Sequence, residues 1–396
     1  MNIYIDATSL LRKPDGVGRY GSSVVSQLLA RDHDNHYRAL AFADDRPKFK
    51  AIPPAELKYE YLPLPRQIYN QWFKRIGQVS INRWLKKRPD VVIYPNFVNF
   101  PKIKNTKSIV VIHDLAYLEA PQTLTKRSLG KLEKVVPKSF VRPNLHYLEK
   151  FVPRALEQAT AVVAVSEETR DAIAAQYGLN ASDITVIPNA VDEKFFSRRS
   201  AEELQAVRVK YGLPDDFILF LGTIEPRKNI MNLLEGYASL PAKLREQYPL
   251  VLAGKKGWNS EGIDQRVQEL LEEGNSILTT GFVDDEDLPA LLKAANLLLW
   301  PSIHEGFGLP ILEAMAAGTP VVTSDLAPMN RLGEDAALFV TPDKPVTITS
   351  AVRRVLESPK LAKEMTKKGK LVAKKHRWDN SAQAMLELIN RLGNDD

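Results

Sequence analysis

The sequence contains no cysteine, which excludes disulfide bonds, a thiol nucleophile and cysteine-ligated metal centres. It also lacks any run of the ~18 consecutive apolar residues that a membrane-spanning helix requires. The first residues, "MNIYIDATSLL", have no basic segment followed by a long apolar core, so we expect no signal peptide. Together these features lead us to expect a cytoplasmic protein.

The balance of charge restricts the possible partners less sharply. Lysine and arginine outnumber aspartate and glutamate by 54 to 48, which gives a net charge of +6 and a pI of about 9.1. A modest basic excess suits an anionic small molecule, a nucleic acid or a membrane surface, and does not choose among them. The length of 396 residues predicts two or three domains.

Short runs rich in valine, isoleucine and leucine alternate with helical patterns along the whole chain. Most of these runs are continuously apolar, which is typical of parallel strands covered by helices on both faces. The predicted strands of the first half are residues 3–6, 37–43, 90–95, 108–114, 161–166 and 184–188. Those of the second half are residues 217–222, 250–254, 276–281, 297–302, 320–325 and 337–341.

The alternation of strands and helices restarts near residue 217. The charged stretch 193–216 before it is interpreted as a linker and a helix that leads into a second domain. We therefore predict an α/β protein with two Rossmann-like domains that face a central cleft. The first domain is predicted to span residues 1–195 and the second residues 196–377. The last helix, within 378–396, is expected to pack back on the first domain.

The stretch "HEGFGLPILEAMAAGTPVV" (304–322) places two carboxylates on either side of a Gly-Pro turn. Glu305 lies in a loop at the carboxyl end of the predicted strand 297–302, where open parallel sheets bind ligands. Glu313 lies about one turn into the following helix, whose start offers backbone N–H groups to a phosphate or sugar. Carboxylate oxygens accept hydrogen bonds from sugar hydroxyls. The alternative is that Glu305 caps the helix and Glu313 lies on its surface.

A second group of charges follows the first strand of the second domain, in "LGTIEPRKNI" (221–230). Arg227 and Lys228 are adjacent cations at a strand-to-helix junction. Arginine offers a planar pair of donors and lysine a compact charge, so together they suit a diphosphate. Lys255 and Lys256 lie at the end of the next strand and are expected at the same edge of the sheet.

The segment "GVGRYG" (16–21) matches the G-x-G-x-x-G pattern of dinucleotide-binding folds. Asp44 and Asp45 fall near the spacing of the ribose-binding acid, which would support a dehydrogenase. However, the glycines do not follow the strand directly, as that fold requires. We favour a loop over the cleft in which Gly16 and Gly18 open a helix of residues 19–30.

Three further candidates have weaker support. His113 ends a strand of the first domain, where it is either a functional residue or a packed core histidine. Ser166 precedes a helix and is well placed to cap it. Asp285 and Asp287 form an Asp-x-Asp pattern, which we interpret as acids in the first turn of a helix. No metal site is predicted.

Taken together, these motifs resemble the large retaining glycosyltransferase family that has the two-Rossmann GT-B fold (glycosyltransferase family 4-like). The resemblance rests on the Glu-x7-Glu stretch and on "GTIEPRKN", "VVAVSEETR", "VIPNAVD" and "GVGRY", which occur in the family's usual order. It covers nearly the whole chain, and the motifs are highly specific in combination.

The resemblance implies roles for individual residues. Glu305 would contact the hydroxyls of the donor sugar, and Glu313 would hold the ribose of the nucleotide. Arg227 and Lys228 would neutralise the diphosphate leaving group, and His113 would lie near the transferred sugar. The remaining donor-binding positions would be Gly306, Phe307, Gly308, Leu309, Phe282, Val283, Gly16 and Gly18. The acceptor-binding positions would be Tyr20, His113 and Ser166.

The resemblance also implies the chemistry. The family transfers a sugar with retention of configuration and without a metal, so no cofactor is expected. The closest likeness is to bacterial mannosyltransferases that use GDP-mannose in lipopolysaccharide and other surface-polysaccharide synthesis. The alternatives are a glucosyl- or rhamnosyltransferase that uses UDP-glucose or dTDP-rhamnose and, in a different class, a non-catalytic sugar-nucleotide-binding protein.

Residues 121–155 depart from the regular alternation of strands and helices. The wider segment 101–155 holds eleven Lys/Arg against four Asp/Glu, with apolar residues interleaved. One interpretation is a solvated helical excursion. The other is a basic, amphipathic surface that contacts the inner face of the cytoplasmic membrane or a lipid-linked glycan acceptor. No nucleic-acid partner is expected.

Overall fold

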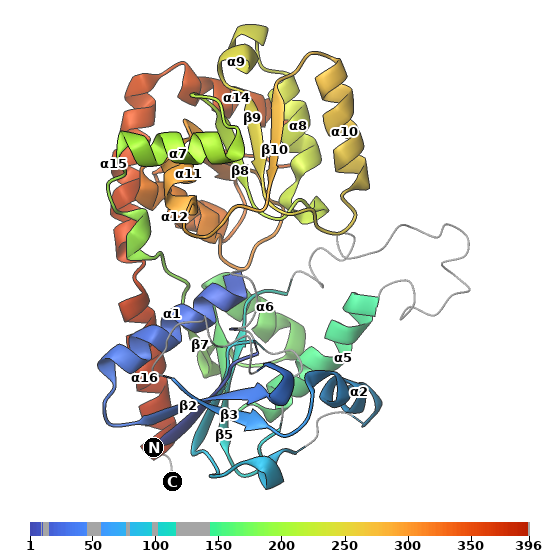
Figure 1. The fold of residues 1–396 in the computed structure, drawn as a ribbon, viewed down its shortest axis with the longest axis vertical. Helices are drawn as coiled ribbons and strands as arrows, with labels where there is room; N and C mark the ends of the chain where they lie inside the picture. Colours follow the sequence, from blue (N-terminus) through green and yellow to red (C-terminus); the bar gives the residue numbers. More distant parts are fainter. Residues whose placement is uncertain are drawn as a thin grey trace, which may run out of the picture. The chain divides into compact units, whose positions relative to one another are not determined.

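The computed structural model describes residues 1–8, 10, 16–45, 57–76, 80–96, 102–115 and 143–394, and the chain divides into two compact units (Figure 1). The first unit contains Met1–Leu115, Tyr147–Ala190 and Trp378–Asp396, and the second takes in Val191–Arg377. Each unit is built around its own parallel sheet. The predicted α/β fold with two Rossmann-like domains is therefore confirmed.

The first unit has a seven-stranded sheet in the order β3-β2-β1-β4-β5-β6-β7, in which every pair of neighbours is parallel. Its central strands are almost completely buried because helices cover them. The strands are β1 (Asn2–Asp6), β2 (His36–Phe42), β3 (Lys58–Leu62), β4 (Val91–Tyr94), β5 (Lys107–Ile112), β6 (Ala161–Ala164) and β7 (Ile184–Val186).

The C-terminal helix belongs to this first unit, where it packs against α1. Lys107 Nζ donates a hydrogen bond of 2.7 Å to the carbonyl of Leu392. Arg31 Nη2 lies 3.4 Å from Asp379 Oδ2. The helices of the unit are α1 (Gly16–Arg31), α2 (Arg66–Ile76), α5 (Pro143–Gln158), α6 (Glu167–Tyr177) and α16 (Trp378–Asn394).

The second unit has a six-stranded parallel sheet in the order β10-β9-β8-β11-β12-β13. Strands β8, β9, β11 and β12 are buried along their whole length, whereas the edge strand β10 is partly exposed. The strands are β8 (Ile218–Leu221), β9 (Leu250–Ala253), β10 (Ile277–Gly281), β11 (Leu297–Trp300), β12 (Val321–Ser324) and β13 (Ala337–Val340).

The helix predicted to lead into the second unit is α7 (Ala201–Tyr211). It begins with a capping box, in which Ser200 and Glu203 satisfy each other's backbone N–H groups. The other helices are α8 (Ile230–Ala238), α9 (Ala242–Gln247), α10 (Glu261–Glu272), α11 (Leu288–Ala294), α12 (Leu309–Ala317), α13 (Met329–Gly333), α14 (Pro345–Leu356) and α15 (Pro359–Lys375).

Strand β3, with the sequence "KYEYL", is absent from the prediction. It lies at the edge of the first sheet and carries Lys58 and Glu60, so it has no continuous apolar run. Glu60 is nevertheless buried, because Tyr4 Oη and the amide of Lys86 each donate to it over 2.6 Å. A buried, hydrogen-bonded glutamate gives no hydrophobic signal in the sequence.

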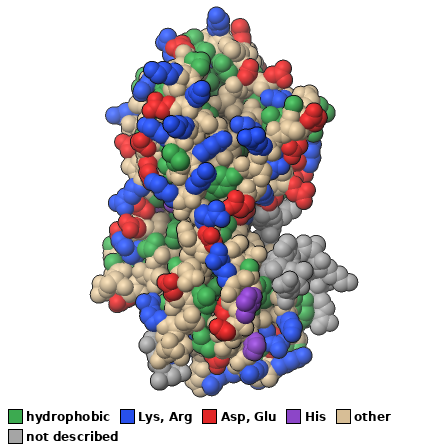
Figure 2. All heavy atoms as spheres, turned by 90° about the vertical axis from the view of Figure 1, so that its left-hand side faces the viewer, with side chains coloured by type: hydrophobic (Ala, Val, Ile, Leu, Met, Phe, Trp, Pro, Cys, Tyr) green, Lys and Arg blue, Asp and Glu red, His purple; other side chains and the backbone are tan. Residues whose placement is uncertain are grey.

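The face of the second unit that carries α7 and α15 shows basic and acidic side chains interspersed (Figure 2). Several of them pair, as Lys368 does with Asp335 and Lys375 with Glu334, each over 2.9 Å. The basic excess of the chain is therefore not gathered into one patch on this face. Among the residues that the structure describes, none of the helices has the length and apolarity needed to cross a bilayer.

Candidate functional site

The loop that carries Glu305 is fixed at both of its ends. Trp300, the last residue of β11, donates a hydrogen bond from Nε1 to the carbonyl of Leu221 over 2.9 Å. Its own carbonyl accepts a hydrogen bond from Thr323 Oγ1 over 2.9 Å. At the other end, Gly308 precedes α12 with φ of 111°, a conformation that residues with a Cβ rarely adopt. The chain can therefore turn sharply from the sheet into the helix.

The loop after β8 docks on the loop after β11. It contains a short 3-10 helix, η7 (Pro226–Lys228), which ends at Asn229 in a left-handed conformation. Asn229 Nδ2 donates to the carbonyls of Pro301 (3.0 Å) and Pro342 (2.6 Å). The amide of Ile303 donates to the carbonyl of Arg227 over 3.0 Å. These bonds hold the ends of two neighbouring parallel strands together, as the predicted site requires.

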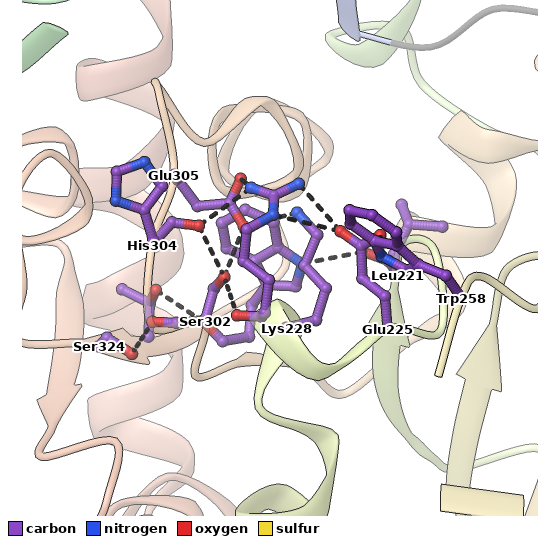
Figure 3. A network of polar contacts seen from close by, with 11 residues as sticks. Leu221, Glu225, Lys228, Trp258, Ser302, His304, Glu305 and Ser324 are labelled. Carbon is purple, nitrogen blue, oxygen red and sulfur yellow. Dashed lines mark hydrogen bonds and ion pairs between the residues drawn. The ribbon is translucent and has the colours of Figure 1, made fainter. Parts of the chain in front are cut away.

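Glu305 forms hydrogen bonds with both predicted cations, and Figure 3 labels Glu305 and Lys228. Arg227 Nη1 donates to Glu305 Oε2 over 3.0 Å and to the carbonyl of His304 over 3.0 Å. Lys228 Nζ and Ser302 Oγ both donate to Glu305 Oε1 over 2.5 Å. Glu305 and Lys228 are 9% and 8% exposed, so these charges have largely left water.

Burial and pairing oppose each other in this cluster. Burial by itself raises the pKa of Glu305, but Arg227, Lys228 and the hydrogen bonds bring that pKa below its ordinary value. The pKa of Lys228 is also lowered, because burial and the neighbouring Arg227 outweigh the attraction of Glu305. The carboxylate is thus held ionised, and a further anion beside Lys228 would stabilise its ammonium form.

Three residues that the sequence analysis did not select complete the network. Glu225 Oε1 accepts from Arg227 Nη2 (3.0 Å) and Nε (3.2 Å). Its other oxygen, Oε2, accepts from Trp258 Nε1 over 2.8 Å. Ser302 is fully buried beneath Glu305. Glu225 stands two positions before Arg227 and Ser302 directly follows a strand, so the rule that selected their neighbours could have found both.

The interpretation of the two glutamates as a cap and a surface residue is wrong. Gly308 occupies the N-cap position of α12, not Glu305. Glu313 is 3% exposed and lies on a helix whose neighbouring residues Leu312 and Ala314 are fully buried. Both carboxylates are therefore enclosed in the second unit.

The other predicted donor residues lie in different surroundings. Phe307 is buried, and its ring meets the ring of His376 edge-on with centroids 5.9 Å apart. Leu309 is buried at the start of α12. After β10, Phe282 is 41% exposed, whereas Val283 is buried. Gly306 lies in the loop between Glu305 and Phe307.

The predicted acceptor residues lie in the first unit, and two of them are in contact. Tyr20 and His113 have ring centroids 5.3 Å apart in an edge-on arrangement. His113 Nε2 lies 2.7 Å from the carbonyl of Pro95 and carries a proton, since a carbonyl only accepts. Tyr20 is 1% exposed, and its hydroxyl has no hydrogen-bond partner among the residues that the structure describes. Gly16 and Gly18 form the first turn of α1.

Ser166 caps α6, because its Oγ accepts from the amide of Thr169 over 3.1 Å.

Outside the Glu305 cluster, several predicted charges pair with neighbours. Lys256 bonds to Asp264 over 2.8 Å. The acids of the Asp-x-Asp segment bind lysines: Asp287 pairs with Lys210 over 2.6 Å, and Asp285 pairs with Lys194. Within the described parts of the chain, no group of three or more possible metal ligands is found.

Comparisons with known proteins agree with this architecture. The description "Glycosyltransferase Family 4" matches residues 14–195, and "Glycosyl transferases group 1" matches residues 205–372. O-antigen chain mannosyltransferase B of Escherichia coli is 31% identical over 386 residues, which are 95% of this chain and 96% of that protein. Serotype-specific mannosyltransferase WbdA of Escherichia coli is 33% identical over 294 residues, 72% of this chain but only 34% of that protein.

Among solved structures, sucrose-phosphate synthase from Thermosynechococcus elongatus superimposes with a TM-score of 0.69 over the full length of both chains, at 19% identity. This likeness concerns the fold. The match to a relative of nearly equal length, the two family descriptions in tandem and the paired parallel sheets lead to one conclusion. The chain belongs to the glycosyltransferase family that these two descriptions cover, and it is a glycosyltransferase with the GT-B fold.

Proposed function

We propose that this glycosyltransferase transfers mannose from GDP-mannose, with retention of configuration, to a glycan or lipid-linked acceptor in cell-surface polysaccharide synthesis. The observation that carries the proposal is the buried cluster of Glu305, Arg227 and Lys228 at the carboxyl ends of β8 and β11. The choice of mannose is supported by the names of the two Escherichia coli relatives.

In the proposed complex, the donor binds at the loop between Glu305 and α12. Glu305 would accept hydrogen bonds from sugar hydroxyls, and Glu313 would hold the ribose. The start of α12 would offer backbone N–H groups to the diphosphate. Lys228, whose pKa is lowered mainly by burial, would gain a compensating charge from that diphosphate.

The proposed reaction is a front-face displacement through an oxocarbenium-like transition state. The acceptor hydroxyl would attack as the bond to the diphosphate breaks, and the leaving phosphate would take the hydroxyl proton. Arg227 and Lys228 would stabilise the charge that develops on the diphosphate, and Glu305 would orient the sugar. No metal or other cofactor takes part in the proposed reaction.

On the acceptor side, we assign Tyr20 and His113 to the binding of the incoming hydroxyl. Two observations support this assignment: the buried Tyr20 hydroxyl has no partner within the described part of the chain, and the Tyr20 ring contacts the His113 ring. Ser166 is a weaker candidate, because its oxygen already caps α6. Gly16 and Gly18 are proposed to lie near the diphosphate.

The proposal includes peripheral contact with the inner face of the membrane. Of the basic region 121–155, only residues 143–155 lie within the described part of the chain. A second segment, residues 66–88, contains seven Lys/Arg and no Asp/Glu. Within it, Trp72 is 37% exposed and stacks on Trp84, and the Arg83 guanidinium lies 4.5 Å from the Trp84 ring centroid. Aromatic and cationic side chains together suit an anionic lipid surface.

Sedimentation with lipid vesicles tests this contact. The purified protein should pellet with vesicles that contain phosphatidylglycerol and stay in solution with phosphatidylcholine vesicles. Trp72→Ser should weaken the association. Equal recovery with both lipids, or none with either, contradicts the membrane contact and leaves the proposed transfer reaction unaffected.

The donor is tested by measuring binding and hydrolysis of GDP-mannose, UDP-glucose, UDP-GlcNAc and dTDP-rhamnose without acceptor. We expect GDP-mannose alone to raise the melting temperature and to be hydrolysed slowly. Selective hydrolysis of UDP-glucose or dTDP-rhamnose would replace mannose by the corresponding sugar. Tight binding with no hydrolysis or transfer would favour a non-catalytic nucleotide-sugar-binding protein.

A further inference from the structure

A second set of contacts adjoins the Arg227–Glu305 pair and runs from Trp258 through Glu225, both labelled in Figure 3. The indole N–H of Trp258 donates to Glu225 Oε2 over 2.8 Å. Glu225 Oε1 accepts from Arg227 Nε and Nη2. Arg227 then donates from Nη1 to Glu305 Oε2 and to the carbonyl of His304. The four side chains thus form one continuous series of hydrogen bonds.

The backbone brings Trp258 to this position. Gly257 donates to the carbonyl of Ile224 over 2.9 Å, and the amide of Ile224 donates to the carbonyl of Lys255 over 2.9 Å. A Cβ on Gly257 would lie 2.7 Å from Thr223 Cγ2 and 2.9 Å from the Ile224 carbonyl oxygen. Only glycine permits the loops after β8 and β9 to approach so closely, and the next residue is then Trp258.

The chemistry of Glu225 fits an orienting role. Both of its oxygens are used by protein donors, and the residue is 8% exposed. A carboxylate with both oxygens engaged fixes the plane of the guanidinium, since arginine presents its N–H groups in a rigid fork. Glu225 also adds a negative charge next to Arg227, which reduces the positive potential that a diphosphate would meet.

We propose that Glu225 is a positioning residue, held by Trp258, which orients Arg227 so that Glu305 and the His304 carbonyl keep the geometry needed for transfer. This inference rests on the proposed role of Glu305 in holding the donor sugar. According to this inference, Glu225 raises the rate of turnover and does not contribute to the affinity for the nucleotide. The same assignment gives the loop after β9 a part in catalysis through its tryptophan.

The test compares Glu225→Gln with wild type, using whichever nucleotide sugar the wild-type protein hydrolyses and the matching nucleoside diphosphate as the binding probe. Turnover should fall about tenfold or more, since small errors of placement at a reacting centre are costly. Affinity for the diphosphate should stay the same or increase, because a carboxylate beside Arg227 is lost. Unchanged turnover, or parallel losses of turnover and affinity, would overturn the proposal.

Trp258→Phe removes the indole N–H and keeps an aromatic ring. It should lower turnover by about threefold, and the double variant with Glu225→Gln should be no slower than Glu225→Gln alone, because Trp258 acts through Glu225. If the two substitutions lower turnover additively, Trp258 does not act through Glu225. Glu235→Gln is the matched control, since Glu235 pairs with Arg266 over 2.6 Å on α8 and α10 and should leave turnover unchanged.

A spectroscopic readout does not depend on activity. The five tryptophans give five indole N–H resonances, and Trp258→Phe identifies the one from Trp258. In Glu225→Gln this resonance should move upfield as the charge-assisted hydrogen bond is lost. A resonance that does not move would overturn the contact itself. If Glu305→Ala lowers turnover and Glu225→Gln does not, the inference fails while the proposed function stands.

Discussion

Arg227 and Glu305 are 78 positions apart in the sequence, yet a hydrogen bond of 3.0 Å joins Arg227 Nη1 to Glu305 Oε2. The two residues follow β8 and β11, which are neighbours in the sheet although two strands and several helices separate them in the chain. Their loops meet because parallel strands end at the same edge. The pair thereby links the proposed diphosphate contact to the proposed sugar contact.

Ser302→Ala tests the hydroxyl beneath Glu305. Ser302 is fully buried and donates 2.5 Å to Glu305 Oε1. Its loss should lower turnover about fivefold and cost about 1–2 kcal/mol of stability. Ser324→Ala is the control, because Ser324 Oγ is equally buried but bonds over 2.6 Å to the Ser302 carbonyl. Kinetics and thermal melts of both variants should show similar stability losses but a smaller loss of turnover in the control. Equal loss of turnover in both would contradict a specific role for Ser302.

Gly308→Ala tests the turn that leads into α12. At φ of 111° a side chain is strained, and the new Cβ would lie 3.3 Å from both Ile311 and Leu332. We expect a loss of about 1–3 kcal/mol in the free energy of unfolding, measured by denaturant titration. Gly262→Ala is the control, since Gly262 lies in α10 with open space where the new methyl group would lie. That change should stabilise slightly, by about 0.5–1 kcal/mol. If both variants have the same stability, the turn is not strained.

The sequence predicts those parts of the fold and of the candidate site that leave a local pattern of residues, and it does not predict contacts between distant loops. The twelve predicted strands correspond to observed ones, most of them because a continuous apolar run is typical of a parallel strand that is buried on both faces. Strand β3 was not predicted, because the hydrogen bond from Tyr4 that accompanies the burial of its Glu60 leaves no pattern in the sequence. The meeting of Glu305 with Arg227 and Lys228 followed from strand-end geometry, whereas their mutual pairing did not. The Trp258–Glu225 contact was not predicted either, since it depends on the close approach of the loops after β8 and β9.

Asp6→Asn tests the pH dependence of folding. Asp6 ends β1 and is 1% exposed, and burial raises the pKa of its carboxyl to about 6 despite the hydrogen bonds from Thr8. The unfolded chain releases this proton near pH 3.8. The stability that protonated Asp6 contributes is therefore fully present below that pH and is lost as the pH rises through about 6. The variant should be more stable than wild type at pH 7, by on the order of 3 kcal/mol.

Thermal melts from pH 4 to pH 8 measure this effect. The difference between Asp6→Asn and wild type should grow from pH 4 to about pH 6 and level off above it. Asp90→Asn is a control of opposite sign, because the amide of Asn2 lowers the pKa of Asp90. That variant should be less stable than wild type at neutral pH, and the deficit should stay nearly constant from pH 8 to pH 4, because the stability linked to Asp90 is lost only below its unfolded pKa of 3.8. Parallel pH profiles for Asp6→Asn and wild type would contradict the assignment.

The central claim is that the cluster around Glu305 turns over a nucleotide sugar. The most direct measurement compares wild type and Glu305→Ala for hydrolysis of GDP-mannose and for binding of GDP by calorimetry. The account predicts that turnover falls at least about a hundredfold, while GDP binds with similar or higher affinity because Arg227 and Lys228 lose a competing carboxylate. Unchanged turnover, or loss of GDP binding together with activity, would contradict it.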